Sequence, residues 1–599
     1  MRLKLCQRLA MLLADVLQRV RPWYRLPVVP GLLCLIGIRI GLRFHNLYDP
    51  APRRGPDAPK PGEAGFPFGR NQPLWRARHD ADPPLDDPSP RVVSTELLAR
   101  NGRFEAVPFL NLLAGAWLQF QVHDWVMHDK DLDPARKLRV RLARDDPWPQ
   151  RADGDMVVVR SRPSALPPEP GGPPVYDNAD THFWDASQVY GVTPERQAAL
   201  REYAGGRLVL GEDGGLPLDP QTGVDLTGVS NNWWSGLSLL HWLFAKEHNA
   251  ICDRLAAAYP SLGDDELYRL GRRINAAVMA KIHTIEWTPT IMPHPTVQRA
   301  MHSNWYGVGG PRLSRLMRRW SRRDWLIGIP GSDFDDHGVP YSLTEEFVAV
   351  YRMHPLVPDE VRLTGADGRD LGARTILEMA GPAARVVSRD VRPADMLASL
   401  AVARAGRLAL HNYPDSLRNL PRAPEDVAMG DEPRVDLATI DVVRDRERAV
   451  PRYNDFRRML RLPPARSFEE LAGGDAATAG ALRRVYGDVE LVDLMIGLYA
   501  EPLPNGFGFS ETAFHIFVLM ASRRLKSDPA FTDEWTPDVY TREGMRWIGW
   551  RTMADIVADH LPSLRPLVRD VKRPFEPWDR PCNRVSGNTH PFPAAPCDP

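Results

Sequence analysis

The sequence is poor in cysteine, in clear strand patterns and in net charge of either sign. Its five cysteines among 599 residues are scattered and odd in number, and no two form a CxxC pair. This speaks against a disulfide framework and a zinc site, and it favours a reducing compartment, the cytoplasm. Lysine plus arginine and aspartate plus glutamate both total 76, so the net charge gives no support to a nucleic-acid partner.

Alternating patterns typical of strands are few and short, and the clearest lie at residues 156–161 and 207–211. Apolar residues at helical spacing dominate instead, and we find no internal repeat. The long helical segments are residues 107–129, 232–259, 267–288 and 510–528. With 43% hydrophobic and 25% charged residues, the chain has the composition of a globular protein with an ample core, so a mainly α fold with a few short strands is predicted.

Proline is abundant, at 58 residues, and its distribution divides the chain. Prolines concentrate after residue 47 and again beyond residue 572, which predicts extended arms. We therefore expect an amphipathic and apolar N-terminal segment (1–45), a proline-rich arm (46–94), a single large domain (95–572) and a proline-rich C-terminal tail (573–599).

The N-terminal segment mixes leucines with arginines. Apolar residues recur at helical spacing from Leu5 to Val20, and the opposite face is basic apart from Asp15. The apolar run at residues 26–38 contains two prolines and is shorter than the about 20 residues that a transmembrane helix needs. A secretory signal fits poorly because polar residues interrupt the apolar region. We expect peripheral contact with a membrane interface, and the alternative is a helix that packs on the protein body.

The stretch VYRMHPLVPD (350–359) places a tyrosine three residues before a histidine. Pro355 disfavours the helical conformation for the residue before it, so a helix should end at or near His354. Tyr351 would then lie on the same helix face, one turn earlier. Two ring residues that finish a core helix are the alternative.

A second histidine lies in WLQFQVHDWVMHD, where Gln119 and His123 are four residues apart on one helix face. A polar pair in an apolar helix needs partners, which a core hydrogen bond or a functional site could provide. The next residue, Asp124, points about 100° away around the helix and would serve a different partner.

The segment DTHFWDASQVYG has candidate oxygen ligands at every second residue, namely Thr181, Phe183, Asp185 and Ser187. In an extended loop these positions place hydroxyl, backbone carbonyl and carboxylate oxygens on one side. Such a set suits Ca²⁺ when a further carboxylate, here Asp124, completes it. An ordinary turn of Asp and Ser is the alternative.

Taken in order, these motifs resemble the animal-type haem peroxidase superfamily and, within it, the fatty-acid alpha-dioxygenases. The segments LLHWLFAKEHNAICDRL, AKIHTIEWT, FHIFVLMASRRL and YTREGMRWIGW are similar to that family as well, so the resemblance covers roughly residues 95–560. It implies the helical haem peroxidase fold for residues 95–572, with haem b and Ca²⁺ as cofactors.

The resemblance also implies roles for individual residues. His354 is expected to be the proximal ligand of the haem iron, with His123 as the distal histidine and Gln119 as its companion. Tyr351 is expected to form the radical that takes a hydrogen atom from the substrate.

The substrate carboxylate is expected to bind His283, Thr288 and Arg524 on the same resemblance. A guanidinium can hold a carboxylate bidentately in an apolar channel. Because Arg523 and Arg524 are adjacent, we expect one to face inward while the other stays in solvent.

The resemblance assigns calcium to Asp124, Thr181, Phe183, Asp185 and Ser187. Phe183 stands where plant members usually carry tryptophan, which should be harmless because its ligand atom would be the backbone carbonyl.

Three further positions need comment. Gln121 and Val122 replace apolar neighbours of the distal histidine. Asn412 is a candidate acceptor for the proximal imidazole, although a plain loop asparagine explains it equally well.

The implied reaction inserts O2 at the α-carbon of a long-chain fatty acid and gives a 2-hydroperoxy acid. The alternative is a haem peroxidase that uses H2O2 and small aromatic donors. A tyrosine beside the proximal histidine, combined with a carboxylate anchor, favours the dioxygenase. A protein of this fold that has lost haem and serves in adhesion is disfavoured because both histidines and the calcium set are present.

Overall fold

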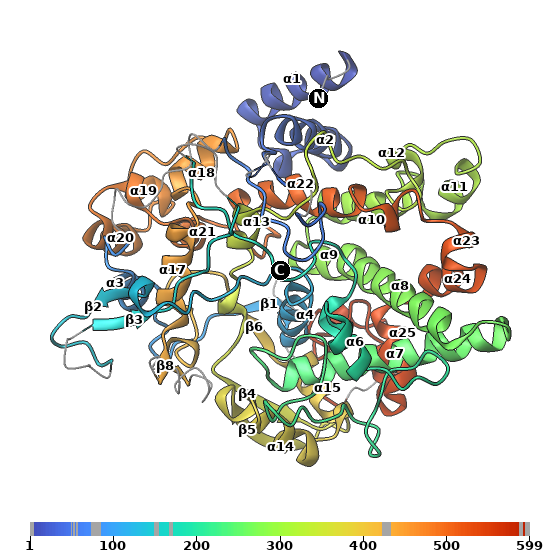
Figure 1. The fold of residues 1–599 in the computed structure, drawn as a ribbon. Helices are drawn as coiled ribbons and strands as arrows, with labels where there is room; N and C mark the ends of the chain where they lie inside the picture. Colours follow the sequence, from blue (N-terminus) through green and yellow to red (C-terminus); the bar gives the residue numbers. More distant parts are fainter. Residues whose placement is uncertain are drawn as a thin grey trace.

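The computed structural model describes the chain except for residues 1–4, 50, 52–53, 56–57, 74–84, 149–154, 167–171, 422–432, 586–590 and 593–599. Helices dominate the described part (Figure 1), and its strands pair only into two-stranded antiparallel ribbons. The ribbons are β1 (Ala106–Asn111) with β6 (Arg404–Gly406), β2 (Leu138–Arg141) with β3 (Asp155–Val158), β4 (Glu360–Thr364) with β5 (Asp370–Thr375), and β7 (Leu420–Pro421) with β8 (Arg434–Val435). The mainly α prediction is therefore confirmed.

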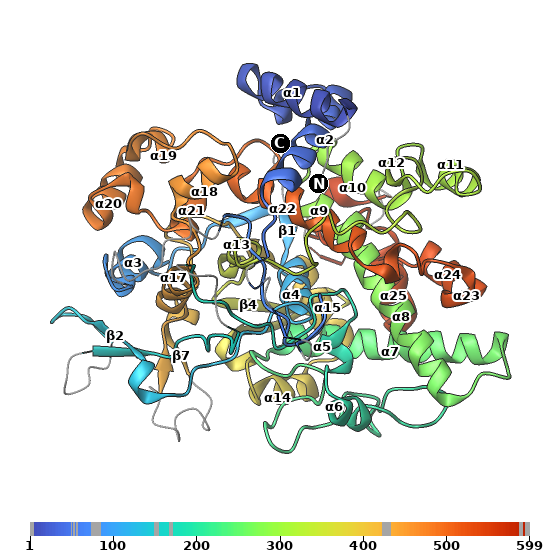
Figure 2. The same ribbon diagram turned by 45° about the horizontal axis from the view of Figure 1, so that its top comes forward.

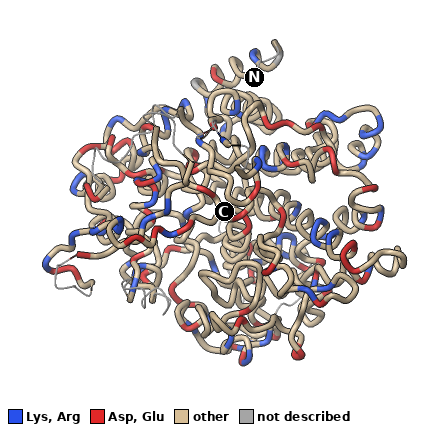
Figure 3. The backbone as a smooth tube through the Cα atoms, in the orientation of Figure 1, with Lys and Arg blue, Asp and Glu red and all other residues tan. Residues whose placement is uncertain are grey.

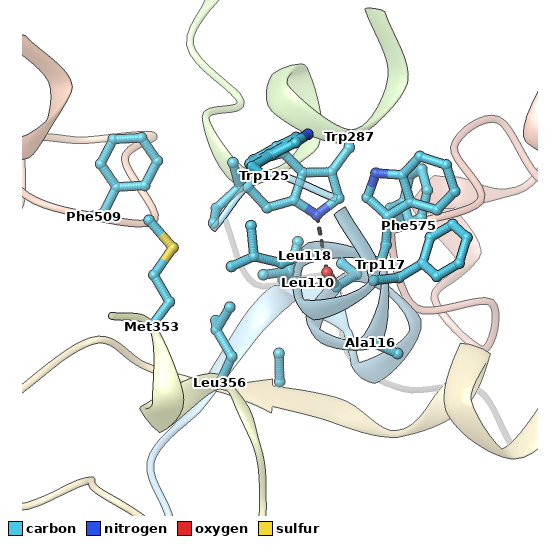
Figure 4. Packing of buried hydrophobic residues seen from close by; sticks show 14 of the residues in the cluster. Leu110, Ala116, Trp117, Leu118, Trp125, Trp287, Met353, Leu356, Phe509 and Phe575 are labelled. Atoms are coloured by element: carbon cyan, nitrogen blue, oxygen red, sulfur yellow. Dashed lines mark hydrogen bonds between the residues drawn. The ribbon is translucent and has the colours of Figure 1, made fainter. Parts of the chain in front are cut away.

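Helix α4 (Leu112–Val122) lies in the centre of the core. Its apolar side chains are buried among aromatic residues (Figure 4), and Trp287 Nε1 donates a hydrogen bond of 2.9 Å to the carbonyl of Ala114. The predicted helix 107–129 is wrong at both ends. Pro108 cannot serve the interior of a helix, and Asn111 caps α4 by accepting from Ala114 N at 3.1 Å. The preceding residues therefore form β1, and the helix ends before His123.

Helix α7 (Ser235–Ala258) packs against α4, and α8 (Asp264–Ile282) packs against α7. The two confirm the helices predicted for 232–259 and 267–288. Gly271 lets them approach, since a Cβ there would lie 2.7 Å from the sulfur of Cys252. Helix α8 continues into a π-helical turn (His283–Trp287) and then α9 (Thr288–Ile291) and α10 (Pro295–Tyr306). The other helices that matter below are α11 (Gly310–Met317), α12 (Asp324–Ile327), α13 (Glu345–Val350), α14 (Ala383–Asp390), α15 (Pro393–Val402), α17 (Leu437–Glu447) and α22 (Glu511–Lys526).

The N-terminal residues form a helical hairpin of α1 (Leu5–Val20) and α2 (Val28–His45), which projects at the top of Figures 1 and 2. Helix α2 packs against α10 and α22. The expectation that prolines break its apolar run is wrong, because Pro27 is the N-cap and Pro30 lies in the first turn, where a missing N–H costs nothing. Among the described residues, α2 is the one helix that is long and apolar enough to cross a membrane, by length and composition only.

A continuous hydrophobic cluster runs from Ala14 to Phe592 and contains both Trp23 and Trp578. The terminal segments thus share one core with the central domain, and the boundaries of the four parts remain predictions. Cys34 and Cys252 are buried free thiols, whereas Cys582 is disulfide-bonded, which the sequence did not lead us to expect.

Candidate active site

The VYRMHPLVPD stretch departs from its predicted geometry. Helix α13 ends at Val350, so Tyr351 is its C-cap, and His354 opens a separate 3-10 turn that has Pro355 in its second position. Between them the backbone turns, with Met353 N donating to the carbonyl of Tyr351 at 2.8 Å. Tyr351 and His354 therefore do not share a helix face, and their side chains enter different surroundings.

His354 is held by a buried aspartate that the sequence analysis missed. Its Nδ1 lies 2.9 Å from Asp441 Oδ2. The same carboxylate receives Arg352 at 2.8 Å and the hydroxyl of Tyr413 at 2.9 Å. Burial alone would raise the pKa of Asp441, but His354 and Arg352 hold it well below its usual range. With Nδ1 engaged by an anion, Nε2 is the nitrogen left to bind a metal.

Asn412 does not have the role predicted for it. Its side-chain oxygen accepts from Glu105 N at 3.0 Å, and its Nδ2 donates to the carbonyls of Glu105 and Arg407, both at 2.8 Å. These bonds tie down the end of the β1–β6 ribbon. The acceptor beside His354 is Asp441, on α17, far along the chain and without a local motif to reveal it.

The second histidine, His123, caps the end of α4, and its Nδ1 is buried without a hydrogen bond. Burial lowers the pKa of His123 to about 4, so the ring is neutral. Gln119 Oε1 accepts from Trp234 Nε1 at 2.8 Å, and its Nε2 donates to the carbonyl of Asn232 at 3.1 Å. His241 of α7 is also buried, with neither ring nitrogen bonded, and burial and His123 lower its pKa. The end of α4 and the neighbouring part of α7 therefore offer neutral imidazoles with unbonded nitrogens.

Arg524 of α22 lies between two tryptophans. Its guanidinium carbon is 3.7 Å from the ring centroid of Trp125 and 4.4 Å from that of Trp184. Its Nε and Nη2 are buried without a hydrogen bond. Its positive charge acts to lower the pKa of Asp124, but no carboxylate of the described residues lies within ion-pair distance of it. A buried cation of this kind calls for an anionic partner. Arg523 is buried as well and donates to backbone carbonyls of residues 336–342, so the expectation that one arginine stays in solvent is wrong.

The π-helical turn brings His283 and Thr288 together. The amide and the hydroxyl of Thr288 both bond to the carbonyl of His283, the latter at 2.8 Å. The His283 ring stacks on Trp287 at 4.5 Å, and its Nδ1 accepts from Trp117 Nε1 at 3.3 Å. Burial and Arg524 lower the pKa of His283, so the neutral ring carries its proton on Nε2 and can donate from there.

Tyr351 joins the same cluster through Trp125. The two rings lie edge to face at 5.6 Å, and the phenol also packs on Phe347 at 4.7 Å and on Phe517 at 4.9 Å. Trp125 is in turn 5.4 Å from the His283 ring. The Tyr351 hydroxyl makes no hydrogen bond to the described residues, and burial raises its pKa above the ordinary value, so the phenol keeps its proton.

The predicted calcium residues also meet. Asp124 Oδ1 accepts from the amide of Ser187 at 2.6 Å and from its hydroxyl at 3.1 Å, and Asp185 accepts from the hydroxyl of Thr181 at 3.1 Å. A further carboxylate, Asp180, accepts from Ser187 Oγ at 2.6 Å. Burial, together with Asp185 and Asp180, raises the pKa of Asp124, and burial raises that of Asp180 to about 7.

The remaining member of the calcium set contributes no side chain. The Phe183 ring stacks on Tyr341 at 5.3 Å and lies against Gly62, where a Cβ would come within 2.2 Å of it. Only its carbonyl is available. In the described residues, no three His, Cys, Asp or Glu side chains converge closely enough to hold a metal in this conformation.

Two residues close to Arg524 escaped the sequence analysis, although both lie inside quoted motifs. Trp125 follows Asp124, and Trp184 follows Phe183. Trp184 Nε1 donates to Gln121 Oε1 at 2.8 Å, which explains a polar residue at that position of α4. The sequence signal for this contact was Gln121, a polar residue in an apolar helix, which needed a hydrogen-bond donor such as a tryptophan N–H.

Comparisons with known proteins agree over nearly the whole chain. Residues 55–572 match the family model of the animal haem peroxidases. Alpha-dioxygenase PIOX of Oryza sativa subsp. japonica is 37% identical over 593 residues, which cover 93% of each chain. The crystal structure of fatty acid alpha-dioxygenase from Arabidopsis thaliana has a TM-score of 0.87 at 31% identity, covering 99% of this chain and 96% of that one. A tyrosine-to-phenylalanine variant of the Oryza sativa enzyme, solved with palmitic acid, has a TM-score of 0.86 at 35% identity, covering 96% and 98%. The predicted haem peroxidase-like fold is confirmed.

The ion cluster around Asp441 gives a prediction for stability. Asp441→Ala leaves Arg352 with one carboxylate fewer in a buried position and should lower the free energy of unfolding by about 3–5 kcal/mol. Asp441→Asn should cost less, since an amide oxygen can still accept from Tyr413. Thermal or urea unfolding measures both, with the exposed Asp390→Ala as the control that changes little. Equal losses for Ala and Asn would show that the acceptor oxygens do not matter.

Proposed function

Because the chain belongs to the fatty-acid alpha-dioxygenases of the animal haem peroxidase family, we propose that it inserts O2 at the α-carbon of a long-chain fatty acid. It is an oxidoreductase, and the product would be a 2-hydroperoxy acid. The observation that carries the substrate is the buried, unpaired guanidinium of Arg524, which contacts the same tryptophan as the phenol of Tyr351. A peroxidase for small aromatic donors would have no use for this cation.

The residues present fit the haem that the family implies. His354 would hold the iron through Nε2, from a ring paired with Asp441, and His123 offers a second imidazole that is neutral and has an unbonded Nδ1. Arg444, on α17 one turn from Asp441, has a buried Nε without a partner, and burial with Arg448 and Arg352 lowers its pKa to about 10. This unmatched positive charge suits the propionates. When bound, haem supplies the one-electron oxidant that a phenol requires.

The carboxylate would bind to Arg524 and to the Nε2–H of His283, with its alkyl chain among apolar side chains. The Thr288 hydroxyl would add a third bond once it turns from the carbonyl of His283. After loss of one electron and one proton, the Tyr351 phenoxyl takes the α-hydrogen, and O2 adds to the carbon radical. The peroxyl group then recovers a hydrogen atom from Tyr351, which regenerates the radical.

The phenol gives a decisive prediction. Tyr351→Phe should retain the fold and its melting temperature, because the hydroxyl bonds to none of the described residues, while oxygen uptake with palmitic acid falls by orders of magnitude. Tyr306→Phe, a half-buried tyrosine on α10, is the matched control. Substantial α-oxygenation by the Tyr351 variant would refute the radical mechanism.

The anchor gives a second prediction. Arg524→Ala should raise KM for fatty acids about 10- to 150-fold, since a charge-assisted hydrogen bond contributes roughly 1.5–3 kcal/mol. Arg524→Lys should recover part of this loss, and wild-type protein should turn over a methyl ester poorly. Steady-state oxygen uptake measures all three. Equal turnover of acid and ester would contradict the anchor.

We also propose that Ca²⁺ binds beside α4, to Asp124, Asp185, the hydroxyls of Thr181 and Ser187 and the carbonyl of Phe183. What supports this is a surplus of buried negative charge. One oxygen of Asp124 and one of Asp180 are buried without a partner, and a divalent cation would relieve the repulsion between the carboxylates. Ser187 would turn its hydroxyl proton away from Asp124 to become a ligand.

Calcium binding predicts a linked loss of metal and stability. Asp124→Asn removes one negative charge from the site and should lower both the calcium content and the melting temperature. Atomic emission and differential scanning calorimetry measure the two, with Asp213→Asn in an exposed turn as the control. If atomic emission finds no calcium in the purified wild-type protein, this proposal is wrong.

For the N-terminus we propose contact of α1 with a lipid surface. The helix turns Ala14 towards α2 and presents its leucines to solvent, with Leu5 74%, Leu12 62% and Val20 82% exposed. A stripe of this kind beside arginines is typical of interfacial helices. This outward direction speaks against the alternative of a packing helix.

The hairpin gives the last prediction of this set. Deleting residues 1–20, which removes α1 and keeps the buried Trp23, should leave the haem spectrum unchanged and should reduce co-sedimentation with vesicles that contain anionic phospholipid. Replacing Leu9, Leu12 and Val16 by serine in the full chain is the milder companion variant. Sedimentation equal to that of the wild type for both variants would contradict the contact.

A further inference from the structure

The segment from Val308 to Trp325, which contains α11 and α12, exposes large apolar side chains between arginines. Trp320 is 69% exposed, more than any other aromatic side chain in the described part of the chain. The others on this surface, which we call the α11–α12 surface, are Val308, Leu313, Leu316 and Trp325. Burial in the core explains none of them.

The charge of this surface is strongly one-sided. Residues 308–325 contain six arginines and one aspartate, although the whole chain has no net charge. Arg318 turns inward and donates to the carbonyl of Ile327, and Arg322 pairs with Asp333. The exposed arginines without an ion pair to any described residue are Arg312, Arg315, Arg319 and Arg323. Figure 3 shows the blue positions gathered around α11 at the upper right.

This surface lies beside the N-terminal hairpin. Helix α10 packs against α2 on one side and against α11 and α12 on the other, and Arg39 of α2 donates to Asn304 of α10 at 3.3 Å. In Figures 1 and 2 the hairpin and the α11–α12 surface both lie along the upper edge of the molecule. Residues 5–45 repeat the same charge bias, again with six arginines and one aspartate.

We propose that the α11–α12 surface binds an anionic lipid surface together with the hairpin. Tryptophans prefer the headgroup level of a bilayer, and arginines at that level meet phosphates. Leucines between the arginines would gain from insertion below the phosphates, whereas a nucleic acid would leave them in water. This inference extends the lipid contact proposed for α1, but it rests on different residues.

The test uses full-length protein and vesicles of phosphatidylcholine with 30% phosphatidylserine, or of phosphatidylcholine alone. Arg315→Gln with Arg319→Gln should weaken partitioning to the anionic vesicles, roughly fivefold for each arginine, and should change binding to neutral vesicles little. Trp320→Ser with Trp325→Ser should weaken binding to both. The control is Val386→Ser with Arg389→Gln on α14, an exposed pair at the opposite end of the molecule in Figure 1.

The outcomes separate this inference from the hairpin proposal. Loss of binding only on deletion of residues 1–20 would overturn the inference and leave the hairpin proposal standing, and loss only in the α11–α12 variants would do the reverse. Sedimentation velocity of the same variants without vesicles measures whether the protein forms dimers, and so distinguishes a protein–protein contact from lipid binding. A dimer abolished by Trp320→Ser with Trp325→Ser, with vesicle binding unchanged, would assign the surface to a second copy and overturn the inference. Unchanged melting temperatures show that the variants are folded.

Discussion

A guanidinium removed from water and given no carboxylate is the constraint on which the candidate site depends. Arg524 lies against the faces of Trp125 and Trp184 and bonds to the Tyr341 hydroxyl, and these neutral groups stabilise its charge only in part. The surrounding residues are arranged around this deficit. His283 is kept neutral with its proton on the nitrogen free to donate, and the phenol of Tyr351 packs on the other edge of Trp125. The carboxylate of a fatty acid, as proposed above, would supply the missing anion.

Around His354 the protein supplies the anion that pairs with the ring. Asp441 pairs with the His354 ring and accepts from Arg352 and Tyr413, and Asp445 of the same helix accepts from Arg352 as well. The imidazole is therefore oriented before any metal binds, as enzymes with a preorganised site require. The two halves of the site thus differ in kind. In one, the ring of His354 is paired with an anion of the protein, and in the other, the guanidinium of Arg524 has no carboxylate of the described residues within ion-pair distance.

The sequence predicted the family and the fold better than the local geometry of the candidate site. Motif order identified the family and hence the fold, because side chains such as His123 and His354 each lie in a short specific segment. Local rules failed where tertiary contacts decide. Residues 107–111 form a strand because β6 pairs with them. Arg523 is buried because it donates to the backbone carbonyls of a loop that is distant in the sequence. Asp441 was missed because no local sequence pattern links it to His354, which lies far away in the chain.

The π-helical turn between α8 and α9 has a consequence for how this site can change. A π turn accommodates one residue more than an α-helix does, and here that surplus lets the Thr288 amide and hydroxyl reach the same carbonyl as they pass His283. Removing a single residue would restore regular winding and swing every later side chain by about 100°. No series of substitutions leads gradually from one arrangement to the other. The relative placement of His283 and Thr288 can thus be gained or lost only by insertion or deletion of a residue, not by point mutation.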